Sequence, residues 1–154
     1  MSYVSRTNGL CFNNNHVSIE IAQKSNADRV SVIRMTLPFN EAPPLHVHHE
    51  EDELFHILSG EIRYRIGDLI TVKRAGDSAL APRGIPHGFR VISKGGATVL
   101  IITRGGFEEM VRSVSRPAAI AGLPDQVEPS PEMQAMLTDQ CALRNIEILG
   151  APIA

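Results

Sequence analysis

Short apolar segments separated by turn residues fill the first 104 residues, and this pattern limits the fold more than any other feature. Val17, Ile19 and Ile21 alternate with polar residues, and residues 31–37 are largely apolar or β-branched. Similar segments cover residues 54–58, 62–66, 71–73, 78–81, 88–93 and 97–104. Many short strands at this spacing are typical of an antiparallel barrel or sandwich. We therefore predict an all-β fold for this part of the chain.

Ser59 and Gly60 predict a tight hairpin turn between the strands on either side of them. In such a hairpin, Phe55 would oppose Tyr64. Side chains two residues apart on a strand share one face, so Glu53 would point to the same side as Phe55.

The pattern becomes helical after residue 104. One apolar helix face is predicted around Met110, and Ser130 followed by Pro131 is typical of a second helix start. The apolar stripe of the second helix is interpreted as core packing; it comprises Met133, Met136, Leu137 and Cys141. Alternation at the end of the chain predicts a short final strand. We expect one domain, residues 1–154, with a barrel at about 17–104 and a helical extension at about 105–154.

Composition excludes several classes of function. Of 154 residues, 43% are hydrophobic and 21% charged, as in globular proteins, and the net charge is −2. There is no long basic run, so nucleic-acid binding has no support. The longest apolar segments, such as residues 97–103, are too short to span a membrane. Cys11 and Cys141 form no disulfide framework, which indicates a cytoplasmic protein with reduced thiols.

Five of the six histidines lie between residues 46 and 87. His46 and His48 would point to the same face of a strand, and Glu53 begins the next strand. His87 follows a turn rich in proline and glycine. Three imidazoles and one carboxylate suit one divalent transition metal ion, namely Fe, Ni, Mn, Co or Zn. Four protein ligands would leave positions on an octahedral ion for substrate.

These residues resemble the two motifs of the cupin superfamily. The first is His46-x-His48-(x4)-Glu53-(x6)-Gly60, and the second is Gly76-(x5)-Pro82-x-Gly84-(x2)-His87. Two positions depart from the usual pattern: Asn40 stands where the family has glycine, and Val91 where it has asparagine.

The resemblance implies a jelly-roll barrel around one metal ion, with short C-terminal helices. The segment EDELFHILSG and the C-terminal segments are similar to single-domain quercetin-dioxygenase-like cupins. For these the resemblance implies a metal-dependent dioxygenase acting on a small aromatic or enol substrate, with Glu53 as both metal ligand and catalytic base. Such a base would need a pKa raised by a dry pocket. A homodimer is also implied, and the outward face containing Leu54, His56 and Leu58 is consistent with it, although the C-terminal helices are an alternative cover for the same face.

Strand parity predicts the substrate pocket. The side chains expected to share the metal's side of the barrel are Phe55, Ile57, Tyr64, Phe89 and Val91. His49 and His56 have the opposite parity, and Glu51 is a candidate to orient a ligand histidine.

Two other functions remain open. A non-oxidative metal cupin, such as an isomerase, lyase or decarboxylase, would need additional charged groups inside the barrel, which Arg34 and Arg104 are candidates to supply. A cupin that binds a small molecule without catalysis is the third possibility.

Overall fold

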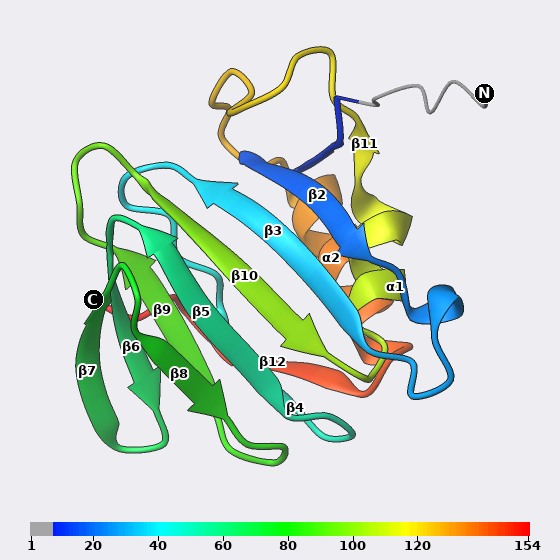
Figure 1. Cartoon of the computed structure of the whole chain (residues 1–154), viewed down its shortest axis with the longest axis horizontal. Helices are drawn as coiled ribbons and strands as arrows, with labels where there is room; N and C mark the ends of the chain where they lie inside the picture. The colour runs from blue at the N-terminus through cyan, green and yellow to red at the C-terminus, as the bar shows by residue number, and fades with distance from the viewer. Residues whose placement is uncertain (1–7) are drawn as a thin grey trace.

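The computed structural model describes residues 8–154, which form two antiparallel β-sheets that face each other (Figure 1). The seven-stranded sheet has the order β11-β1-β2-β3-β10-β5-β8, and the five-stranded sheet has the order β12-β4-β9-β6-β7. The strands are β1 (Leu10–Phe12), β2 (Asn15–Ile21), β3 (Ser31–Leu37), β4 (Leu45–His48), β5 (Glu53–Ser59), β6 (Glu61–Ile66), β7 (Leu69–Arg74), β8 (Ser78–Ala81), β9 (His87–Val91), β10 (Ala97–Thr103), β11 (Arg116–Pro117) and β12 (Ile146–Gly150). The helices are a short 3-10 turn η1 (Gln23–Ser25), α1 (Phe107–Val114) and α2 (Pro131–Ala142).

The core lies between the two sheets, because each central strand buries alternate residues. On β3 the residues at odd-numbered positions, such as Ile33 and Met35, are buried, and β10 follows the same rule. On β5 the buried positions are Glu53, Phe55 and Ile57. This two-residue period is the one read from the sequence. The prediction of an all-β jelly roll with short C-terminal helices is confirmed.

The predicted hairpin at Ser59 and Gly60 is wrong. Strand β5 pairs with β10 and β8, whereas β6 belongs to the other sheet and pairs with β7 and β9. Gly60 has a φ of 81° and passes close to the Gly96 backbone, which leaves no room for a Cβ. The chain therefore turns a corner from one sheet to the other. Phe55 and Tyr64 face each other across the barrel, with ring centroids 5.0 Å apart, instead of pairing along one sheet.

The two α-helices pack against each other at one end of the barrel, on the far side of β2 and β3 in Figure 1. Helix α2 begins as predicted: the Ser130 hydroxyl accepts a 3.1 Å hydrogen bond from the Met133 backbone. The chain then returns as β12, which pairs with β4 and so with the strand carrying two of the predicted ligands. None of the helices in residues 8–154 has the length and apolar character needed to cross a membrane.

Candidate metal centre

The four side chains predicted as metal ligands meet inside the barrel, although they come from both sheets. His46 and His48 lie on β4, His87 begins β9, and Glu53 begins β5. The antiparallel pairing of β4 with β9 places His46 directly opposite His87. One nitrogen or oxygen atom from each of the four residues lies within 4.8 Å of the other three. This spacing is short enough for all four atoms to bind one ion.

Glu53 lies at the centre of the cluster. Its Oε2 atom is 3.1 Å from Nε2 of His48 and 2.9 Å from Nε2 of His87. These three side chains are only 2–3% exposed. His46 is half-buried and faces the adjoining cavity. The cluster is therefore enclosed by protein, except on the side of His46, where it opens onto the cavity.

The other nitrogen of each ring is held by a fixed acceptor. Nδ1 of His46 lies 2.7 Å from the Pro44 carbonyl, and Nδ1 of His87 lies 3.1 Å from the Ile85 carbonyl. A carbonyl oxygen only accepts, so each Nδ1 carries a proton, and Nε2 is the atom that would bind a metal once it is deprotonated. Three imidazole nitrogens and a carboxylate oxygen fit a divalent first-row transition metal ion.

The electrostatics of the cluster favour a proton on His48 when no metal is bound. Burial alone would lower the pKa of His48, but the carboxylates of Glu53 and Glu51 raise it to about 10. Burial, followed by the nearby His87, lowers the pKa of His46 to about 4. Burial opposes the charge on Glu53, yet His48 and His87 hold the pKa of its carboxyl well below the usual range. The sequence-based expectation of a raised Glu53 pKa is therefore wrong for the metal-free protein, because two imidazole partners outweigh desolvation.

Metal binding should strengthen as the pH rises. A pKa of about 10 means that His48 is protonated below that value, so an incoming ion must displace a proton. We expect affinity between pH 6 and pH 8 to increase about tenfold per pH unit for each proton released. Titration of the metal-free protein with Co²⁺ against a chelating dye at three pH values measures this slope. A flat profile would contradict the protonated His48.

A second carboxylate, that of Glu51, contacts one of the clustered histidines. Oε1 of Glu51 lies 2.9 Å from Nδ1 of His48, and the Glu51 side chain is 2% exposed. There is no room for a Cβ at Gly105, because it would overlap the Glu51 carboxylate. Glycine at position 105 is thus required for Glu51 to reach His48. The sequence identified Glu51 as a candidate to orient a histidine, but not the glycine that makes its position possible.

The substitution Gly105→Ala should displace Glu51 and loosen His48. We expect the free energy of unfolding to fall by about 1–3 kcal/mol and metal affinity to fall by about 10–100-fold. Thermal unfolding and metal titration measure the two effects. Gly95→Ala is the matched control, since a Cβ at Gly95 meets nothing within 4 Å. Equal behaviour of the two variants would show that Glu51 does not depend on Gly105.

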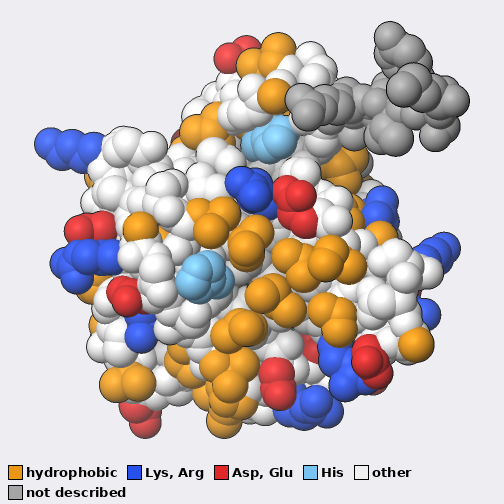
Figure 2. Space-filling view, viewed as in Figure 1, with side chains coloured by type: hydrophobic (Ala, Val, Ile, Leu, Met, Phe, Trp, Pro, Cys, Tyr) orange, Lys and Arg blue, Asp and Glu red, His pale blue; other side chains and the backbone are white. Residues whose placement is uncertain are grey.

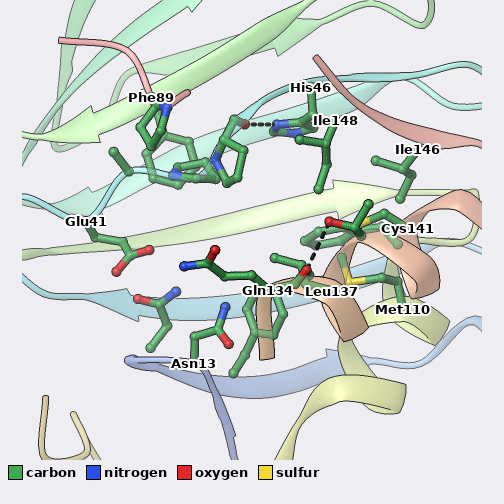
Figure 3. Close-up of a pocket in the computed structure, with 18 of the residues that line it drawn as sticks. Asn13, Glu41, His46, Phe89, Met110, Gln134, Leu137, Cys141, Ile146 and Ile148 are labelled. Atoms are coloured by element: carbon green, nitrogen blue, oxygen red, sulfur yellow. Dashed lines mark hydrogen bonds between the residues drawn. The ribbon is translucent and has the colours of Figure 1, made fainter. Parts of the chain in front are cut away.

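A cavity of about 470 Å³ adjoins the cluster and is largely apolar (Figure 3). Two of the predicted pocket residues, Phe55 and Phe89, are on its wall. The other three are fully buried in the core and are not among its lining residues; they are Ile57, Tyr64 and Val91. Strand parity fixes the face to which a side chain points but not its depth along the barrel.

Part of the cavity wall comes from outside the predicted barrel. Helix α1 contributes Met110, and helix α2 contributes Met133, Leu137 and Cys141. Met136, assigned to the same apolar stripe, is instead 44% exposed. The turn between β1 and β2 adds Asn13 and Asn14, and Asn15 is the first residue of β2. A run of asparagines predicts a turn, but no local signal connects this turn to the metal cluster.

The other candidate residues lie away from the cluster. His49 is exposed and bonds to Glu147, while His56 bonds to Ser78 on the outer face of the sheet. Arg34 pairs with Glu20, and Arg104 reaches the Asp28 backbone; both arginines are exposed. Among residues 8–154, neither lysine nor arginine lines the cavity. The candidate inward arginines are thus absent from the site.

Comparison with known protein families shows which family this part of the chain is similar to. Residues 33–103 match the family described as the Cupin domain, and this segment includes all four clustered side chains. A search of curated proteins gave no significant match to the chain.

Solved structures share the cupin fold at low sequence identity. A predicted oxalate decarboxylase from Thermotoga maritima is 20% identical, with a TM-score of 0.56 over 66% of this chain and 88% of that chain. The polyketide cyclase RemF from Streptomyces resistomycificus is 22% identical, with a TM-score of 0.52 over 65% of this chain and 70% of that chain. The protein TT1209 from Thermus thermophilus is 32% identical over 51% of this chain and 75% of that chain, with a TM-score of 0.48.

The two residues that depart from the cupin motifs, Asn40 and Val91, are hydrogen bonded to each other in the structure. Asn40 has a φ of 66°, in the left-handed region that asparagine tolerates better than other residues with a side chain. Its backbone N–H donates a 3.1 Å hydrogen bond to the Val91 carbonyl, and the Val91 N–H donates to the Glu41 carbonyl at 2.9 Å. Asn40 therefore adopts a conformation that glycine reaches most easily, at the position where the cupin motif usually has glycine. These bonds also fix Glu41, which lines the cavity.

Proposed function

We propose that the protein is a metal-dependent dioxygenase that acts on a small aromatic or enol substrate, similar to quercetin dioxygenases. The observation that carries this proposal is the three-histidine, one-carboxylate cluster that opens onto a cavity with aromatic walls. Its proposed metal ligands are His46, His48, Glu53 and His87. A bound Fe, Ni, Mn, Co or Zn ion would supply Lewis acidity that stabilises a deprotonated substrate oxygen.

Glu53 is the proposed catalytic base. In the metal-free protein its carboxylate is held by Nε2 of His48 and of His87. These are the atoms that would bind the ion, so Glu53 would give up both hydrogen bonds on metal loading. Burial would favour proton uptake from a substrate hydroxyl by this carboxylate, whereas the charge of a bound ion would oppose it.

Aromatic side chains are proposed to position the substrate. Phe55 and Phe89 form part of the cavity wall, with ring centroids 6.1 Å apart, and Phe107 lies 5.9 Å from the His48 ring. Such walls favour a flat aromatic molecule and exclude water from its reacting atoms. We propose that Phe55 and Phe89 contact the substrate, while Ile57, Tyr64 and Val91 support them from the core.

Oxygen uptake by metal-loaded protein tests the proposal. Metal-free protein is loaded separately with each of the five ions, and an oxygen electrode follows the reaction with a flavonol such as quercetin. We expect metal-dependent uptake of one dioxygen per substrate, with ring-opened product found by mass spectrometry. A product formed without oxygen uptake would favour an isomerase, lyase or decarboxylase. Flavonol binding without any product would favour a binding protein.

The non-oxidative alternative has less support from the cavity. An acidic substrate is held best by cationic groups, and the candidate arginines, Arg34 and Arg104, are exposed away from the cavity. The oxidative proposal needs no such group, because an aromatic ring is held by apolar contacts. It is therefore the function that the geometry favours.

We propose that a second copy of the chain covers the outer face of the seven-stranded sheet. The strand register places Val32, Ile102, Leu54 and Leu80 in one row across β3, β10, β5 and β8. Figure 2 shows hydrophobic side chains gathered over this face. The C-terminal helices do not cover it, since they line the cavity on the opposite side. A cytoplasmic location is proposed with the dimer, because Cys11 and Cys141 are both free.

Sedimentation velocity tests the dimer. The substitution Leu80→Glu changes a side chain that is 51% exposed, so it should leave the fold intact and produce a monomer. Leu143→Glu is the control, because Leu143 is 73% exposed and lies outside the row. A monomeric unmodified protein would contradict the proposal.

A further inference from the structure

The cavity has a second polar region that the metal cluster does not include. Four side chains form it: Asn13, Asn15, Glu41 and Gln134. They come from the turn between β1 and β2, the first residue of β2, the loop before β4, and helix α2. In Figure 3 the polar groups of Asn13, Glu41 and Gln134 point toward one another, away from the His46 ring. We call these four residues the amide end of the cavity.

Asn15 is the most informative member of the amide end. It is 4% exposed, and its Oδ1 atom has no hydrogen-bond partner among residues 8–154. Buried carbonyl oxygens of side chains are nearly always hydrogen bonded in folded proteins. The Asn15 side chain also donates a hydrogen bond to the Glu41 carboxylate, which uses one of the two N–H donors of its amide. A ligand group that donates a hydrogen bond at this end would satisfy Oδ1.

Glu41 adds a second acceptor, held in place by its backbone. Its carbonyl accepts from Val91, and its N–H donates to the Pro38 carbonyl at 3.2 Å. Burial raises the pKa of the Glu41 carboxyl, although the bond from Asn15 lowers it in part. No lysine or arginine from residues 8–154 lines the cavity to pair with this carboxylate. A ligand that carries an anionic group at this end would be repelled.

The donors and acceptors of the amide end together select one kind of group. Oδ1 of Asn15 and the Glu41 carboxylate accept hydrogen bonds, while the side-chain amides of Asn13 and Gln134 each offer N–H donors as well as an acceptor oxygen. An ammonium group only donates and a carboxylate only accepts, whereas a hydroxyl does both. Of these three groups, the hydroxyl alone can use both kinds of partner at this end.

We propose that the amide end binds a hydroxyl group of the substrate, remote from the atoms that approach the metal cluster. The substrate class is then an aromatic molecule with a metal-binding oxygen pair at one end and a neutral hydroxyl at the other. This inference rests on the proposed function for its choice of aromatic ligands. Asn15 and Glu41 are its specificity-determining residues.

Three flavonols that differ at one position provide the test. Kaempferol has a hydroxyl at the 4′ position, kaempferide has a methoxy group there, and galangin has hydrogen. Calorimetry with zinc-loaded protein under anaerobic conditions measures their Kd values without turnover. We expect kaempferol to bind about tenfold more tightly than the other two, the gain typical of a hydrogen bond to a charged acceptor.

Variants of the amide end identify the residues responsible. Asn15→Leu and Glu41→Gln should each reduce the preference for kaempferol over galangin by about threefold or more. Gln134→Ala, at an exposed helix position, serves as a further variant with little risk to folding. Glu147→Gln is the matched control: this carboxylate is 60% exposed and pairs with His49 outside the cavity. Thermal unfolding confirms that each variant is folded.

The outcomes separate this inference from the proposed reaction. Equal Kd values for kaempferol and galangin, no binding of any of the three, or a preference unchanged in all three variants would overturn the hydroxyl site. A preference for kaempferol that the variants abolish supports the site even if oxygen uptake is absent, in which case only the oxidative function fails. Oxygen uptake with equal Kd values would leave the function standing and remove the hydroxyl site.

Discussion

The substitution His48→Ala should remove most of the bound metal. A site with four protein ligands supplies about 12 kcal/mol of binding free energy, so one lost ligand weakens binding by about 3 kcal/mol, or more than a hundredfold. We expect metal content by mass spectrometry to fall from near one equivalent in gently purified protein to below about a tenth. Metal-free His48→Ala should also unfold more easily, because Glu51 and Glu53 lose a shared buried partner.

His49→Ala is the control for this experiment. His49 follows His48 in sequence but is exposed and bonds to Glu147, so its loss should leave the metal content unchanged. If His48→Ala proves too unstable to purify, His46→Ala tests the same point, because His46 is only half-buried. Full metal content in both ligand variants would show that the ion binds elsewhere.

The substitution Glu53→Gln should slow the proposed reaction more than it weakens metal binding. Glutamine keeps the size of the side chain and one oxygen ligand but cannot accept a proton at neutral pH. Loss of a general base lowers the rate by about a hundredfold to ten-thousandfold. Oxygen uptake, expressed per metal-loaded protein, measures this effect, and Glu147→Gln serves as the control.

The ratio of the two effects identifies the role of Glu53. A fall in metal content with an unchanged rate per bound metal would mean that Glu53 is a ligand but not a base. An unchanged rate with full metal content would contradict both roles. A slow rate in fully loaded protein would support the base.

Strand faces were predictable from the sequence because side chains alternate along any β-strand. Glu53 and Phe55 are buried on β5, as their parity requires. The partner of β5 was not predictable. A turn signal at Ser59 and Gly60 is compatible with a hairpin or with a corner between sheets. The choice depends on β8 and β10, which pair with β5 from far along the chain.

The amide end and Gly105 show a second limit of local sequence. Asn15 and Gln134 are more than a hundred residues apart, yet both line one cavity. Gly105 follows β10, and only the fold places it against Glu51. No spacing rule connects such positions, because their proximity results from packing a helical extension onto the barrel.

The sequence alone determined the all-β architecture, the inward faces of the strands and the four clustered side chains. Each of these depends on the two-residue period of a strand or on the spacing within one short motif. The tertiary structure alone decided which strands pair, which aromatic residues reach the cavity, and where the amide end and Glu51 lie. The physical reason is that pairing and depth depend on contacts between distant segments, and these contacts form only when the whole barrel closes.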